Sequence, residues 1–119
     1  MSVNRYICFM SVQILLDKLK QKQIVFKDVL DYIQENYSYT PSAFTNGSQV
    51  NSAEENQGSA RVLFFAKLEN LSQEDTLSLF AEHYESVLAT PDQTDHQNIR
   101  QFQMHGFQGL KFENDVLKK

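Results

Sequence analysis

The amino-acid sequence predicts an all-α (mainly α) fold: a single small domain of about five helices with one long polar loop. Apolar residues recur at helical spacing in several segments, and proline, glycine and polar runs separate those segments. The 119 residues fit one domain, 1–119, and an apolar content of 41% is enough for a single core. We find no heptads and no internal repeats, so a coiled coil or a repeat array is not expected.

Two helices are expected in the first third of the chain. The first covers about 11–21, with Ser11 as its N-cap, and carries one apolar face formed by Val12, Leu15, Leu16 and Leu19. The second covers about 25–37 and repeats this spacing with Phe26, Val29, Leu30, Ile33 and Tyr37. Pro41 prevents the second helix from continuing.

Residues 41–60 form the long polar loop of the prediction, rich in Asn, Ser and Gly. Asn46-Gly47 is a turn signal, but the flanking residues alternate poorly, so a β-hairpin is not expected. A loop of this length is either a functional segment or a plain surface connection, and the sequence leaves both open. The apolar run 61–68 that follows is expected to be a buried helix, with Ser59 as a candidate cap.

Two further helices complete the prediction. One begins at Ser72 as N-cap and reaches about residue 88, with an inner face formed by Leu77, Phe80, Ala81, Tyr84 and Leu88. Pro91-Asp92 breaks the chain, and the last helix is expected over about 95–105, ended by Gly106. Residues 107–112 are expected to hold a short extended piece.

The stretch ATPDQTDHQN, residues 89–98, has two interpretations. In the structural one, Thr94 and Gln97 form a capping box, in which the Thr94 hydroxyl accepts a hydrogen bond from the backbone N–H of Gln97. Asp95 then lies in the first helical turn, where a negative charge is favourable, and shares the inward side of the helix with Ile99.

In the functional interpretation the same stretch contributes to a small polar site. If the last two helices pack antiparallel, His83 comes close to Asp92, Asp95 and His96. Oxygen and nitrogen ligands of this kind suit a metal, but no ligand pair has the spacing that places both on one helix face. We therefore expect no metal and no cofactor.

Composition excludes several classes of function. A net charge of −4, a pI near 5.3 and scattered basic residues argue against nucleic-acid binding. No segment is long enough to span a membrane, and the apolar start lacks a signal-peptide cleavage site. The single cysteine, Cys8, has no disulfide partner. No nucleophile elbow, P-loop or dinucleotide motif is present, so the sequence favours a binding protein over an enzyme.

Several stretches resemble the HopJ type III effector family of Proteobacteria: AFTNG (43–47), N-x-x-E-x-N-x-G-S (51–59), LFFAKL (63–68), LSQEDTLSLFAEHY (71–84), VLATPDQTDHQNIRQF (87–102) and HGFQGLKF (105–112). The resemblance covers about residues 10–115. The chain departs from the family pattern at Glu54, Ala60, Gln93 and Phe107. Ala60 stands where the family usually has a cysteine, which argues against a cysteine nucleophile. The family motif implies a candidate polar site formed by Asn46, Asn51, Asn56, His83, Asp92, Asp95, His96, Asn98 and Arg100.

The resemblance implies a protein made in the bacterial cytoplasm and delivered into a host cell by a type III system, where it acts by binding a host or bacterial protein partner. The alternative is a cytoplasmic housekeeping protein with a small polar ligand-binding or catalytic pocket. Nucleic acid and membrane are not expected as partners under either hypothesis.

We predict that residues 1–9 are a dispensable extension, because the resemblance starts near Met10 and Ser11 can start the first helix. Thermal unfolding of the full chain and of a chain starting at Met10 should give the same midpoint. If Tyr6 and Phe9 instead bury against the core, the midpoint drops by several degrees, the scale expected for about 1 kcal/mol or more.

Overall fold

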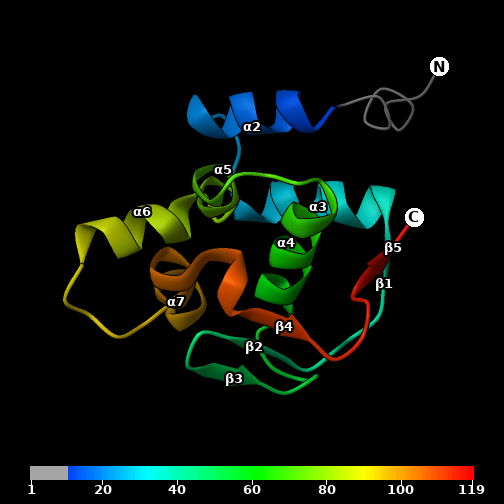
Figure 1. The fold of residues 1–119 in the computed structure, drawn as a ribbon. Helices are drawn as coiled ribbons and strands as arrows, with labels where there is room; N and C mark the ends of the chain where they lie inside the picture. The colour runs from blue at the N-terminus through cyan, green and yellow to red at the C-terminus, as the bar shows by residue number, and fades with distance from the viewer. Residues whose placement is uncertain (1–10) are drawn as a thin grey trace.

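The structure, a computed structural model, describes residues 11–119. These residues form six α-helices and two small antiparallel sheets (Figure 1). The helices are α2 (Val12–Lys20), α3 (Phe26–Asn36), α4 (Gln57–Leu68), α5 (Gln73–Ser78), α6 (Glu82–Ala89) and α7 (Gln97–His105). The fold is mainly helical but mixed α/β, which corrects the all-α prediction. The expected extension, residues 1–9 with Cys8, lies outside the described residues.

The predicted polar loop 41–60 contains a β-hairpin, which corrects the prediction that none forms there. Strands β2 (Phe44–Asn46) and β3 (Gln49–Asn51) pair antiparallel, and β4 (Leu110–Phe112) adds to the other edge of β2. Three-residue strands are too short for alternation to appear in the sequence, and β4 supplies a partner from more than sixty residues away, so a local pattern does not reveal them. β1 (Ser38–Tyr39) pairs separately with β5 (Leu117–Lys118).

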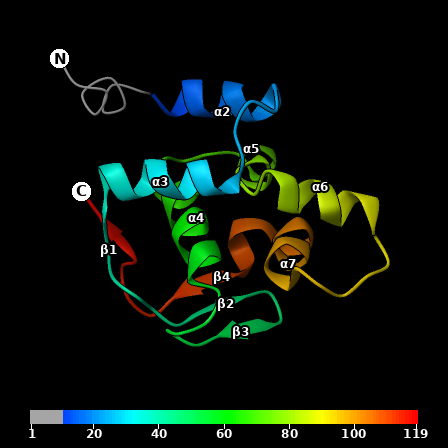
Figure 2. The same cartoon turned by 180° about the vertical axis from the view of Figure 1, so that it is seen from behind.

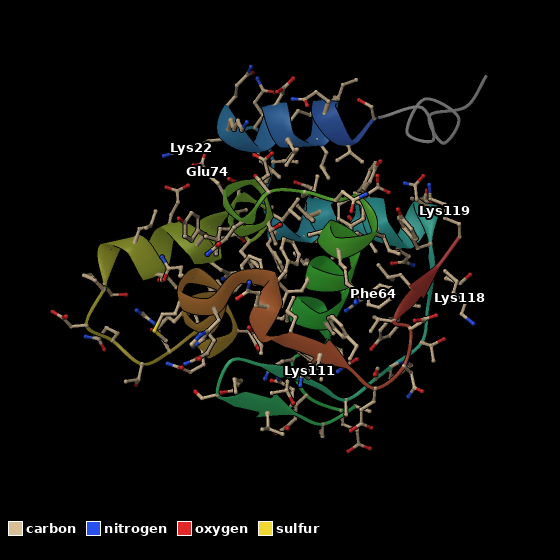
Figure 3. The ribbon with its side chains drawn as sticks, viewed as in Figure 1. Lys22, Phe64, Glu74, Lys111, Lys118 and Lys119 are labelled. Atoms are coloured by element: carbon tan, nitrogen blue, oxygen red, sulfur yellow. The ribbon has the colours of Figure 1, made fainter. Side chains whose placement is uncertain are left out.

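Helix α4 forms the centre of the core. Both views of the ribbon place it between α3 and the three-stranded sheet (Figures 1 and 2). Val62, Leu63, Phe65 and Ala66 are fully buried, which confirms the buried helix expected over 61–68. Phe64, labelled in Figure 3, packs edge-on against Phe112 of β4 with ring centroids 5.1 Å apart.

The start of α4 differs from the prediction. Asn56, and not Ser59, is the N-cap, and it has a left-handed backbone (φ 53°) without a side-chain capping hydrogen bond. Three other predicted helix ends are confirmed. The Ser11 hydroxyl accepts from Ile14 N–H, the Ser72 hydroxyl accepts from Asp75 N–H, and Gly106 ends α7 with φ 62°.

The single helix expected over 72–88 is two helices. The helix is interrupted at Ala81, which has a positive φ of 50°. Helix α5 therefore ends at Ser78, and α6 begins at Glu82. Leu79 and Phe80 are both buried although they are adjacent. On one straight helix these side chains would point about 100° apart, so burying both favours the break.

The capping box predicted at Thr94 does not form. Helix α7 begins at Gln97, later than the expected 95, and its N-cap is His96 with φ 54°. The Gln97 side-chain amide donates to the Thr94 carbonyl oxygen at 2.8 Å, and the Thr94 hydroxyl is not used as a cap. Asp95 was expected to face inward, but its side chain is 59% exposed because it lies before the helix and turns toward Arg100.

We predict that Gly47→Ala lowers the free energy of unfolding by at least about 1 kcal/mol, because Gly47 has φ +60° and L-residues are disfavoured there. An added Cβ would also lie 2.3 Å from Gln101 Oε1. Gly58→Ala is the matched control, because its Cβ meets Phe26 only at 3.7 Å and alanine favours a helix. Equal denaturation midpoints for the two variants would contradict this account of the hairpin turn.

Candidate functional site

Four asparagines connect the β2–β3 hairpin to the first turns of α4 and α7, and we name Asn46, Asn51, Asn56 and Asn98 the asparagine cluster. Asn46 ends β2, Asn51 ends β3, and Asn98 is the second residue of α7. These three are almost completely buried, at 0%, 1% and 6% exposure, whereas Asn56 is exposed at the edge. A buried amide is stable only if its polar atoms find partners, so the cluster has to be hydrogen-bonded internally.

The hydrogen bonds of the cluster converge on Asn51 and Asn98. Asn46 Nδ2 donates to the backbone oxygen of Asn98 at 2.7 Å and to its Oδ1 at 3.1 Å. Asn98 Nδ2 donates to Asn51 Oδ1 at 3.1 Å, and Asn56 Nδ2 donates to the same oxygen at 2.8 Å. Among residues 11–119, Asn46 Oδ1 is the buried side-chain atom without a hydrogen-bond partner. The cluster thus fixes the first turn of α7 against the hairpin.

Two histidines face each other beside this cluster. The ring centroids of His83 (α6) and His96 (before α7) lie 5.3 Å apart with a 41° tilt. The rings of Phe26 and His83 meet edge-on with centroids 5.0 Å apart, and Phe80 stacks on Phe26 with centroids 5.8 Å apart. Residues that are far apart in the sequence therefore form one aromatic wall.

A cavity of about 350 Å³ lies between this wall and the asparagine cluster. We name it the histidine pocket. His83, His96, Phe26 and Phe80 line it, together with Gly58 and Ser59 of α4 and Gln97, Asn98 and Ile99 of α7. Within residues 11–119 the lining includes no Asp or Glu. The arrangement offers hydrogen-bond donors and an apolar wall in one place.

Both helices that meet at the histidine pocket begin without a side-chain cap. Asn56 and His96 are the N-caps of α4 and α7, and neither side chain accepts a hydrogen bond from the first turn. The first N–H groups of a helix have no partner within the helix, and they carry the positive end of its dipole. The pocket is therefore lined by two helix starts whose donors are not used by capping side chains.

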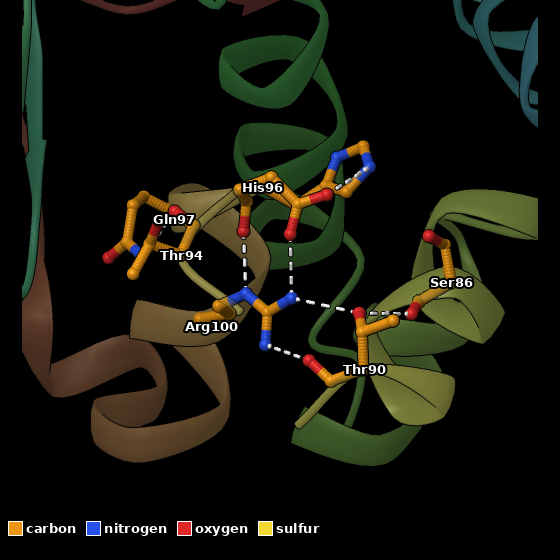
Figure 4. Close-up of polar contacts among 7 residues, drawn as sticks. Ser86, Thr90, Thr94, His96, Gln97 and Arg100 are labelled. Atoms are coloured by element: carbon orange, nitrogen blue, oxygen red, sulfur yellow. Dashed lines mark hydrogen bonds and ion pairs between the residues drawn. The ribbon is translucent and has the colours of Figure 1, made fainter. Parts of the chain in front are cut away.

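Arg100 lies under the loop that leads to His96 (Figure 4). Its side chain is only 10% exposed, and its Nη2 donates to Asp95 Oδ1 at 2.7 Å. This hydrogen bond is the main reason why the pKa of Asp95 is lowered below its ordinary value. Asp95 Oδ2 also lies 3.9 Å from His96 Nε2.

The structure brings eight of the nine sequence-predicted residues into this region. Asn56, Asn98 and the two histidines line the pocket, and Asn46 and Asn51 are hydrogen-bonded to Asn98. Asp95 and Arg100 pair with each other next to His96, outside the lining. Asp92 lies exposed in the 90–96 loop, outside the pocket lining. Phe26 and Phe80 were missed because apolar residues at helical spacing indicate a core, and a core face and a pocket wall look the same in a sequence.

Three other observations bear on the sequence predictions. No helix among residues 11–119 is long and apolar enough to cross a membrane. In the same part of the chain, no three His, Cys, Asp or Glu side chains come together as a metal-binding group. A larger groove of about 450 Å³ lies between α2 and α3, but it includes none of the predicted site residues.

Fold and pocket together define a small, mainly helical protein with a polar cavity between a short sheet and two helix starts. A family model described as HopJ type III effector protein matches residues 12–117, so the chain belongs to the HopJ family. Type III secretion is what the name of this family implies. None of the curated proteins compared with the chain matches it.

The same fold occurs in a solved protein. A crystal structure described as that of the unknown function protein VPA0580 has 42% sequence identity to this chain and a TM-score of 0.83. The similarity covers 92% of this chain and 93% of that one. The similarity therefore extends over nearly the whole of both chains.

We predict that Asn98→Ala lowers the free energy of unfolding by about 2 kcal/mol, because buried partners in Asn46 and Asn51 lose their hydrogen bonds. Asn114→Ala is the control. The Asn114 side chain is exposed, so its loss should change stability by no more than about 0.5 kcal/mol. Urea denaturation measures both. A loss for Asn98→Ala no greater than that of the control would show that the cluster does not stabilise the fold.

Proposed function

We propose that this effector-like protein acts by binding, and that the histidine pocket holds a small ligand with an anionic group, such as a carboxylate or a phosphate. The observation that carries the proposal is the composition of the lining: two imidazoles and two helix starts, with no Asp or Glu of residues 11–119 among the lining residues. Each of these features favours a negative charge over a positive one.

The two helix starts contribute to this preference. An α-helix has the equivalent of about half a positive charge at its N-terminus, and its first N–H groups are free to donate. Helix α4 has 12 residues and α7 has 9, so both are long enough for this effect. Their first turns meet at one cavity, which adds the two contributions.

The two histidines add donors at the opposite wall. A neutral imidazole donates one N–H, and a protonated one donates two and adds a positive charge. His83 is partly buried and the His96 side chain is 33% exposed, so a ligand entering from solvent can contact both. An anion between the two rings would accept hydrogen bonds from both histidines.

Size and shape favour a compact ligand with a flat apolar part. A volume of about 350 Å³ lies at the lower end of the range for small-molecule pockets, about 300–1,000 Å³. Phe26 offers an aromatic surface next to the donors, and the almost fully buried Phe80 stacks against it. An aromatic carboxylate combines both features, and inorganic phosphate represents the anionic group alone.

A second candidate function is binding of a host or bacterial protein partner. Family membership supports it, because a protein delivered into another cell acts on the components of that cell. This candidate stands if no small anion enters the histidine pocket.

We predict that benzoate and phosphate, but not chloride at equal ionic strength, shift the ring resonances of His83 and His96 in a saturable NMR titration. His83→Gln and His96→Asn should each weaken benzoate binding by about tenfold, equivalent to 1.4 kcal/mol. Asparagine is chosen at 96 because it tolerates the left-handed backbone there.

His105→Gln is the matched control, because His105 lies at the far end of α7 and does not line the pocket. The control should bind benzoate as the unchanged protein does. Equal weakening in all three variants, or no saturable shift in the unchanged protein, would reject the small-anion proposal.

A further inference from the structure

One nearly buried guanidinium joins the ends of the two helices that carry the pocket histidines (Figure 4). Arg100 Nη1 donates to the Thr90 carbonyl oxygen at 2.9 Å, just after the C-terminus of α6. Its Nε donates to the Asp95 carbonyl oxygen at 2.5 Å and its Nη2 to the Asp95 carboxylate at 2.7 Å, just before α7. We name Arg100, Asp95 and Thr90 the arginine clamp.

On the α7 side, the clamp holds the backbone around His96. His96 has a left-handed conformation, which costs an L-residue energy, so surrounding contacts have to maintain it. The Asp95 carbonyl oxygen belongs to the peptide plane before His96, and Arg100 fixes it. The His96 carbonyl oxygen belongs to the plane after it and accepts from the N–H groups of Ile99 and Arg100. Both peptide planes that flank His96 are therefore held.

On the α6 side, the clamp holds the helix that carries His83. The Thr90 hydroxyl donates to the Ser86 carbonyl oxygen at 2.7 Å and accepts from Arg100 Nη2 at 3.2 Å. Thr90 is thus fixed to the last turn of α6 and to Arg100 at once (Figure 4). His83 lies in the first turn of the same helix, so the clamp also limits how α6 is placed against α7.

From this geometry we infer that Arg100 is a positioning residue, which acts with Asp95 and Thr90 to set the spacing of His83 and His96 and so to shape the histidine pocket. The inference extends the proposed function, because it gives the pocket a support that does not itself contact the ligand. Arginine suits this role because its planar fork donates in several fixed directions at once, which lysine cannot do.

The test measures the through-space contact between the ring protons of His83 and His96 by NMR in the ligand-free protein. Arg100→Lys keeps the charge but loses the fork, and we expect the ring contact to disappear. Asp95→Ala removes the carboxylate at an exposed position, so it keeps the fold even if Arg100→Lys does not. We expect it to weaken the ring contact.

Asp92→Ala is the matched control, with the same charge change in the same exposed loop. It should leave both the ring contact and benzoate binding unchanged. A ring contact that persists at full strength in folded Asp95→Ala and Arg100→Lys protein, or that disappears equally in Asp92→Ala, overturns the clamp. Because the contact is measured without ligand, this result is separate from the anion titration: the pocket proposal can fail while the clamp stands, and the reverse.

Discussion

The hydrogen bonds between Asn98 and the β2–β3 hairpin are the contact on which the site depends. Asn98 lies in the first turn of α7, and its side chain and backbone together hold Asn46 and Asn51. Buried amides of this kind are stable only in a narrow set of geometries, since each missed bond costs about 1–3 kcal/mol. The hairpin and the start of α7 consequently form one rigid unit, and the histidine pocket opens at its edge.

The same unit explains why two helix starts meet. Asn56 is a residue type that often caps a helix with its own side chain, but here that side chain donates to Asn51. His96 precedes α7 in a left-handed conformation maintained by contacts on both sides. In α7 the N–H of Ile99 already donates to the His96 carbonyl oxygen. The N–H groups before it, and those at the start of α4, have no capping side chain and can donate to solvent or to a ligand, which is the property that a binding site for an anion needs.

The sequence predicted the helices that have a long apolar face and missed the features that depend on distant contacts. Periodicity placed α2 and α3, and the dense apolar run 61–68 with its helix-favouring residues placed the buried part of α4. Ser11 and Ser72 marked the starts of α2 and α5, and Gly106 marked the end of α7. It did not predict the break at Ala81, because burial of both Leu79 and Phe80 is a tertiary requirement. It placed a capping box at Thr94 because local spacing allows one, whereas Arg100 holds the preceding residues in another conformation.

In the candidate site, too, local sequence indicated the residues, whereas contacts between distant segments determine what each residue does. Its polar members were predictable from the family motif, but their roles were not. Asp95 and Arg100 are bonded to each other behind the pocket, so charge alone did not indicate which residues face a ligand. The histidines were distinguishable only in three dimensions: His83 and His96 meet at 5.3 Å, while His105 ends α7 away from the pocket. A sequence motif lists side chains, so it does not show whether a backbone N–H at a helix start lacks a capping partner. The uncapped starts of α4 and α7 can therefore be recognised as possible binding sites only in the structure, where the partner of each backbone N–H can be identified.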